Sequence, residues 1–298
     1  IIFINIIFSP SIPQTKSRFD FNIDKLSLRK IYLFNFFGLF YIFLFISGIV
    51  NLLSFLGKKI KHQSFFDKIE IKKFQLSEEK ASQLFFFIFF TIFSTQIFTI
   101  IFFDTKTDYI AKMIYTNFIL ECILILIILK FIPKNQLNLN FKNLNFGLVF
   151  KLYTAFFPLI FIAFILSGLI LKNFKAEPSI NPAITILLSC NDKFLANLFF
   201  IQIIFLGPLV EELFFRGFIY KLVRTQFSFL FSSLFTSIIF AFLHRSFYDI
   251  LPLTLISLLL CYLYEKTQNL ANVFLLHFLH NSLNLLFLLL LKPYIAIS

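Results

Sequence analysis

The sequence predicts an all-α fold, a polytopic transmembrane bundle of about eight helices with a membrane-embedded polar cavity. Three observations lead to this prediction. Of the 298 residues, 59% are hydrophobic and only 14% are charged, and the mean hydropathy of +0.87 exceeds that of water-soluble domains. The apolar residues form long runs. A small set of ionisable residues lies in or beside the last of these runs, where charge is energetically costly.

The apolar runs define the expected helices, because about 20 apolar residues span a hydrocarbon core of about 30 Å. Seven runs contain no Asp, Glu, Lys or Arg: 31–57, 84–103, 152–171, 194–210, 225–243, 250–264 and 267–291. The eighth run, 113–129, is interrupted only by Glu121. We expect Glu121 to lie at a membrane interface or to pair with another helix, and we leave it out of the predicted site.

Three regions follow along the chain. Residues 1–30 form a polar and basic N-terminal segment, and residues 31–194 contain transmembrane helices of low sequence specificity. Residues 195–291 form the expected core, since nearly all the unusual polar residues fall there. The chain is therefore expected to be an integral, multi-pass membrane protein, whose membrane and oligomeric state the sequence does not specify.

The basic residues are spread through loops and helix ends. Although the formal net charge is +12, this distribution favours contact with lipid headgroups and excludes nucleic acid as the expected partner. Cys122, Cys190 and Cys261 are far apart and show no CxxC spacing, so the cysteines predict neither a disulfide framework nor a zinc site of their own.

The first polar cluster is Glu211-Glu212-Leu-Phe-Phe-Arg216, just after Gly207-Pro208. Residues four apart lie about 40° apart on one helix face, so Glu212 and Arg216 are expected to pair, whereas Glu211 is turned by about 100°. Glu211 is therefore the candidate general base. Pro208 lacks an amide hydrogen, so we expect the helix to kink or to be locally re-formed there.

Two further clusters lie in the last helices. Phe240 and His244 are four residues apart, as are His277 and Asn281. Imidazole and amide groups at membrane depth need hydrogen-bond partners, and the Glu211 cluster is the nearest supply. We therefore expect the three clusters to converge. His280 also lies close by, as either a supporting residue or a packed histidine.

Two chemistries fit this set. In one, Glu211 and His244 polarise a water for attack on a peptide carbonyl while His277 and Asn281 stabilise the oxyanion, with Glu212 and Arg216 as support. In the other, Glu211, His244 and His277 bind a divalent metal such as zinc. The spacing leaves both open, although no HExxH sequence is present.

In these motifs the chain resembles the CAAX prenyl protease and bacteriocin-processing (CPBP, or Abi) family of intramembrane proteases. The family motifs EExxxR, FxxxH and HxxxN/D correspond in order to Glu211-Glu212-xxx-Arg216, Phe240-xxx-His244 and His277-xxx-Asn281. The resemblance covers about residues 195–291. It implies an eight-helix bundle and a glutamate-dependent endopeptidase that acts on a membrane-associated protein or peptide, with prenylated proteins as one substrate class.

By the same resemblance Glu211 activates water, His244 assists, His277 and Asn281 form the oxyanion site, and Glu212 with Arg216 holds the first motif. Two alternatives to the hydrolase remain. One is a non-catalytic membrane scaffold or a bacteriocin-immunity protein, since some family members are linked to those roles. The other is a small proton-coupled transporter that uses the same buried network.

Overall fold

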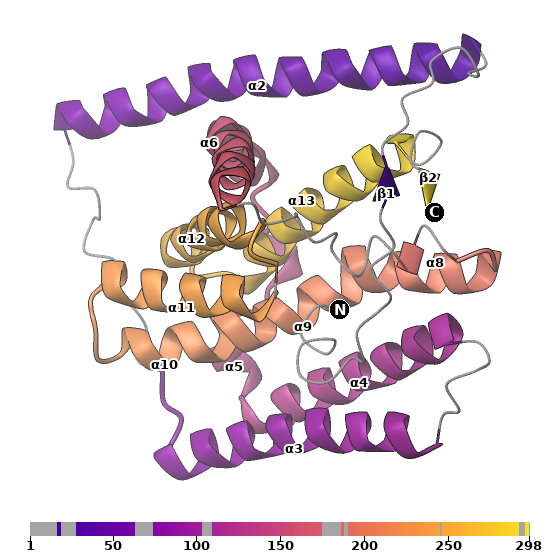
Figure 1. Ribbon diagram of the computed structural model, residues 1–298. Helices are drawn as coiled ribbons and strands as arrows, with labels where there is room; N and C mark the ends of the chain where they lie inside the picture. Colours follow the sequence, from indigo (N-terminus) through magenta and orange to yellow (C-terminus); the bar gives the residue numbers. More distant parts are fainter. Residues whose placement is uncertain are drawn as a thin grey trace.

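The computed structural model describes residues 17–18, 28–62, 74–102, 109–174, 186–187, 190–244, 246–291 and 296–297. The described part confirms the all-α prediction (Figure 1). Its long helices before residue 190 are α2 (Leu28–His62), α3 (Glu78–Phe102), α4 (Tyr109–Phe131) and α6 (Phe146–Asn173), with the short α5 (Lys134–Leu137) and the 3-10 turn η2 (Phe141–Asn143) between α4 and α6. Most of the predicted 1–30 segment lies outside the described residues.

A helix with irregular turns follows from residue 193 to residue 224. It consists of α8 (Lys193–Ile201), the π-helical turn η3 (Gln202–Leu206), α9 (Gly207–Phe214), a second π-helical turn η4 (Phe215–Ile219) and α10 (Tyr220–Arg224). The chain ends with α11 (Phe229–Leu243), α12 (Ile250–Thr267) and α13 (Leu270–Leu291). The described strands are the two-residue β1 (Ser17–Arg18) and β2 (Ala296–Ile297), which pair antiparallel.

The helices correspond to the predicted apolar runs. Within the described part, seven helical segments are long and apolar enough to cross a membrane. The eighth predicted helix, α11, forms where expected, but its 15 residues are fewer than the roughly 20 needed for a full span. Exposed Phe, Ile and Leu side chains cover the outward faces of α2, α3 and α6, as expected for helices in contact with lipid.

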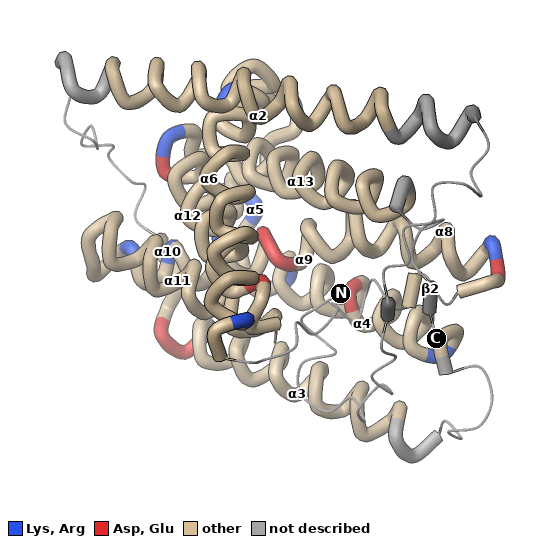
Figure 2. The backbone as a smooth tube through the Cα atoms, turned by 45° about the horizontal axis from the view of Figure 1, so that its top comes forward, with Lys and Arg blue, Asp and Glu red and all other residues tan. Residues whose placement is uncertain are grey.

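The helix that contains the apolar run 194–210 continues through the two glutamates to Arg224, as the helical spacing of Glu212 and Arg216 predicts. The physical reason is that Glu212 and Arg216 pair within the helix, so their charges do not force it to end. The first charged cluster therefore lies inside the bundle rather than at the end of a span, and Figure 2 shows acidic residues on α9 among the surrounding helices.

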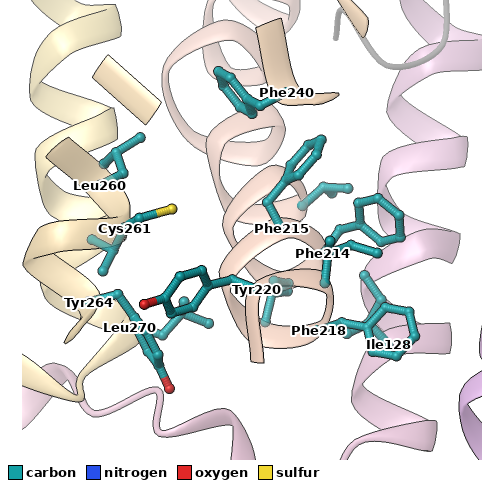
Figure 3. Packing of buried hydrophobic residues seen from close by; sticks show 14 of the residues in the cluster. Ile128, Phe214, Phe215, Phe218, Tyr220, Phe240, Leu260, Cys261, Tyr264 and Leu270 are labelled. Atoms are coloured by element: carbon teal, nitrogen blue, oxygen red, sulfur yellow. The ribbon is translucent and has the colours of Figure 1, made fainter. Parts of the chain in front are cut away.

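The segment 193–224 packs in the interior of the bundle. Helix α9 contacts α4 and α13, and α12 packs against α6, α11 and α13. Figure 3 shows Phe214, Phe215 and Phe218 packed among apolar side chains that include Ile128 of α4 and Leu260 of α12. The apolar core therefore surrounds the helix that carries the two glutamates.

Two asparagines fix the start of α13. Asn269 accepts a hydrogen bond from the backbone N–H of Asn140 and donates to the carbonyls of Asn140 and Asn143. Asn272 accepts from the N–H of Asn145. The polar segment between α4 and α6 is thus held by side chains of α13 and the turn before it, which sets the position of the helix that carries His277.

Helices α2 and α6 approach closely at Gly48. A Cβ atom built on Gly48 would lie 2.6 Å from Cδ of Pro158 and closer still to the carbonyl oxygen of Thr154. Real Cβ atoms do not come this close to backbone. Small residues permit such approaches between membrane helices. Gly38, on the same helix, has no atom within 4 Å of its Cβ position.

We therefore expect Gly48→Val to destabilise the protein by about 1–3 kcal/mol or more through overpacking. Gly38→Val is the matched control and should leave stability nearly unchanged. Thermal unfolding of the purified variants in detergent measures both. Equal melting temperatures for the two variants would contradict the observed packing of α2 on α6.

Candidate active site

Glu212 is the centre of the polar cluster. Its Oε1 accepts a hydrogen bond from Arg216 Nη1 at 2.9 Å, and both side chains are fully buried. The same oxygen lies 2.6 Å from Nδ1 of His277. A carboxylate can only accept, so Nδ1 carries the hydrogen of that bond. The predicted pairing of Glu212 with Arg216 is confirmed, and Glu212 also orients the imidazole of the third motif.

Arg216 extends this network to two more helices. Its Nη2 donates to the carbonyl oxygen of Ser257 at 3.0 Å and contacts the Ser257 hydroxyl at 2.6 Å. Its guanidinium carbon also lies 5.0 Å from the ring centroid of Phe240 on α11. The planar, multiple-donor guanidinium suits these simultaneous contacts, which an ammonium group would not reproduce.

His277 lies between the two glutamates. While Nδ1 faces Glu212, Nε2 lies 3.6 Å from Oε2 of Glu211. The Glu211 contact is longer than a hydrogen bond and is an ion pair when the imidazole is protonated. Both carboxylates and the imidazole are buried. The structure thus joins the first and third motifs, as the sequence predicts.

His244 follows the last residue of α11, and its imidazole is buried. Its Nδ1 lies 2.7 Å from the carbonyl oxygen of Phe240, so Nδ1 carries a hydrogen and the neutral ring presents the Nε2 lone pair. Burial lowers the pKa of His244, while the charge of Glu211 opposes that shift. Burial therefore disfavours the charged form of the imidazole.

Phe240 explains why an aromatic residue precedes His244 by one turn. Its ring centroid lies 4.6 Å from the ring of His244 and 6.0 Å from that of His277, and it is covered on another side by Arg216. Figure 3 shows Phe240 close to Phe215, at a centroid distance of 5.0 Å. Phe240 is therefore packed against members of all three motifs.

Asn281 binds the irregular part of the long helix. Its Nδ2 donates to the carbonyl oxygen of Ile203 at 2.9 Å. In the π-helical turn the N–H of Gly207 donates to the carbonyl oxygen of Gln202. The next hydrogen bond of the same i to i−5 pattern would run from the N–H of residue 208 to the carbonyl oxygen of Ile203. Pro208 has no N–H to give. Asn281 thus satisfies a carbonyl that the proline leaves without its helical partner, and the local re-formation predicted at Pro208 is the π-helical turn.

Two polar residues outside the predicted site also have clear positions. Of the two positions expected for Glu121, the structure favours contact with other helices, since the side chain is 1% exposed on α4. The sequence analysis left Glu121 out of the predicted site, although an ionisable residue inside a span is by default a functional candidate. His280 bonds through its two ring nitrogens to Tyr153 at 3.3 Å and Asn284 at 2.9 Å, which resolves it as a packed, hydrogen-bonded histidine.

The donor set does not favour the metal alternative in this arrangement. Within the described part of the chain, no group of three His, Cys, Asp or Glu side chains is arranged to hold a metal ion. Among the proposed ligands Glu211, His244 and His277, Nε2 of His277 lies 3.6 Å from Oε2 of Glu211, so two of them approach each other without forming a three-ligand group. No catalytic step is therefore derived through a metal.

Comparison with known protein families agrees with this geometry. Residues 193–283 match the family model described as Type II CAAX prenyl endopeptidase Rce1-like. This stretch of the chain is Rce1-like. It contains all three motifs, from Glu211 to Asn281, and the match confirms the resemblance predicted for the last third. No curated protein and no solved structure matches the chain significantly.

Together with the apolar helices, the Rce1-like match supports an integral multi-pass membrane protein. In the structure the segment comprises α8 to α12 and most of α13. The helices α4 and α6 outside the matched residues pack directly on it. Helices α4 and α6 therefore form part of the packing around the Rce1-like segment.

The Glu212–Arg216 pair yields a stability prediction. Arg216→Met should destabilise the protein by about 3–5 kcal/mol, because it leaves the Glu212 carboxylate buried without its cation. Adding Glu212→Gln should recover most of that loss, since the amide oxygen can still accept from His277. Thermal unfolding in detergent compares the two. A double variant no more stable than Arg216→Met would contradict the charge-pairing explanation.

Proposed function

We propose that the protein is an intramembrane endopeptidase of the CAAX protease type, in which Glu211 activates a water molecule. The observation that carries the proposal is the position of His277 between Glu211 and Glu212, with Glu212 also bound by Arg216. Such a buried set of acid, base and cation has the character of a catalytic site rather than of a helix anchor. The Rce1-like match supports the same reaction class.

Two acceptors are available for the attacking water. As the oxygen of the water bonds to the carbonyl carbon, a base must accept one of the two water protons. Glu211 supplies a carboxylate oxygen, and neutral His244 presents the lone pair of Nε2, because its Nδ1 hydrogen is bound to Phe240. We assign proton removal to Glu211 and orientation of the water to His244.

Hydrolysis then proceeds by addition and elimination. Glu211 takes a proton from water, and the hydroxide oxygen bonds to the carbonyl carbon of the scissile peptide. The negative charge moves to the carbonyl oxygen. When the C–N bond breaks, the protonated Glu211 returns a proton to the leaving amine, so the site ends the cycle in its starting state.

The developing oxyanion requires hydrogen-bond donors. When His277 carries both ring protons, its Nε2–H can donate, and the adjacent carboxylates stabilise that cation. Asn281 has a second amide hydrogen besides the one directed to Ile203, and we assign it to the same oxyanion. In this scheme Glu212 and Arg216 are positioning residues that hold His277 in its donor orientation.

We further propose that the substrate is a membrane-associated protein or peptide whose prenylated C-terminal segment enters from the bilayer. Cleavage would remove the last three residues after the prenylated cysteine. This assignment rests on the family described for residues 193–283 and on the location of the glutamates among membrane-spanning helices. An apolar chain in the lipid would help to bring such a substrate to a site at that depth.

The direct test uses purified protein in lipid nanodiscs and a farnesylated peptide that ends in a CAAX sequence. Release of the tripeptide, measured by mass spectrometry, should fall by about 10²–10⁴-fold in Glu211→Gln, because the amide cannot act as a base. Glu79→Gln, at an exposed position in the first turn of α3, is the matched control and should retain wild-type activity.

Metal content of the same samples separates the two water-activation schemes. Activity that persists with no bound divalent metal and in the presence of chelator supports the metal-free scheme. Tripeptide release by Glu211→Gln at the wild-type rate would overturn the role of Glu211. A folded wild type that cleaves neither prenylated nor unprenylated membrane peptides would favour the scaffold alternative.

A further inference from the structure

A second group of buried polar residues lies beside the proposed site. Asn117 and Glu121 are four residues apart on α4, so they share one face of that helix. Both are almost completely buried, and so is Gln202, the first residue of the π-helical turn η3. None of the three belongs to the motifs of the Rce1-like segment, although Gln202 lies within its range.

Helix α4 and the long helix run side by side. Helix α4 contacts α8, η3 and α9 in turn, an arrangement visible in Figure 1. At one level, Gln202 Nε2 donates to the carbonyl oxygen of Ile114 at 3.0 Å. About two turns further along both helices, α4 packs against α9, the helix that carries Glu211. Asn117 lies between these levels on α4.

Two polar atoms at this contact have no hydrogen-bond partner among the described residues: the donor Asn117 Nδ2 and the acceptor Gln202 Oε1. Buried amides without partners are strongly disfavoured, more so in a bundle surrounded by lipid. Water satisfies both needs, because it accepts from one group and donates to the other.

The irregular helix supports this interpretation. A π-helical turn widens the helix by one residue, and such turns are frequent at functional sites. Here the widened turn begins at Gln202 and ends at Leu206, directly before Gly207 and Pro208. It therefore directs a polar side chain from the long helix towards α4, in a span whose other neighbours are mostly apolar.

We propose that Asn117 and Gln202 form a buried water-binding pocket between α4 and η3 that supplies the hydrolytic water to Glu211. The supply role rests on the proposed peptidase function, whereas the binding of water does not. Hydrolysis in a bilayer requires water at a depth that lipid excludes. Water held between α4 and the long helix would remain available to Glu211 during turnover.

The chain offers a reporter for this pocket. Met113 is its single methionine, lies one turn before Asn117 on the same face of α4, and is 7% exposed. The side chain is therefore buried, with little access to bulk solvent. Hydroxyl radicals generated by X-ray radiolysis of bound water oxidise nearby methionine to the sulfoxide, which mass spectrometry quantifies. Labelling of Met113 thus reports local water whether or not the protein is active.

We expect Met113 to be labelled in wild type and labelled at least threefold less in Asn117→Leu and in Gln202→Leu, which keep approximate volume and remove the amides. Ser167→Ala, a buried polar-to-apolar change on α6, is the control and should label as wild type. Melting temperatures confirm that each variant is folded. Equal Met113 labelling in wild type and both folded variants would overturn the pocket.

Turnover of the farnesylated peptide tests the supply role. In Asn117→Leu, kcat should fall about tenfold with KM within about twofold, because the substrate does not contact the pocket. Unchanged kcat in a variant that has lost Met113 labelling would overturn the supply of water to Glu211, but not the binding of water in the pocket. Another outcome is a wild-type protein that cleaves no peptide while Met113 labelling is still lower in both variants than in wild type. In that case the peptidase assignment fails and the pocket stands.

Discussion

The buried carboxylate of Glu212 is the interaction on which the rest of this site depends. One oxygen accepts hydrogen bonds from Arg216 and His277, and Arg216 reaches on to Ser257 and the ring of Phe240. A single charge therefore connects α9, η4, α11, α12 and α13. Removing any partner would leave charge or a strong donor in an apolar interior, so these helices are constrained to one relative arrangement.

A second constraint acts on the backbone. Pro208 interrupts the hydrogen bonding of the long helix, and the π-helical turn before it leaves the Ile203 carbonyl to be satisfied by Asn281. The helix of the third motif therefore contacts the helix of the first motif at two places. Asn281 binds the Ile203 carbonyl, and His277 binds Glu212. The two contacts lie one turn apart on α13, which fixes the rotation of that helix and hence the direction of both side chains.

The sequence was sufficient to predict the helices and the convergence of the motifs, because spans of apolar residues and isolated charges within them have few other solutions. The pairing of Glu212 with Arg216 followed from i, i+4 spacing alone. The same spacing places Glu211 within a helix, but it does not reveal the second π-helical turn, η4, that follows α9. The acceptor of Asn281 was equally inaccessible, because it is a backbone carbonyl released by a proline 73 residues earlier in the chain.

Glu121 shows the limit of searching for partners within one helix. On α4 it has no basic residue at helical spacing, and α4 becomes a neighbour of the glutamate-bearing helix α9 only through tertiary packing. The same holds for Gln202, whose amide reaches Ile114 across that contact. Such pairs depend on which helices are neighbours, and periodicity within a single sequence carries no information on that point.

The most direct test of glutamate-activated water is a single turnover of the farnesylated peptide in H₂¹⁸O. Attack by water predicts one ¹⁸O atom in the new carboxylate of the product and none in the Glu211 side chain. Appearance of ¹⁸O in the peptide that contains Glu211 would instead indicate a covalent acyl intermediate on that carboxylate and would contradict the account.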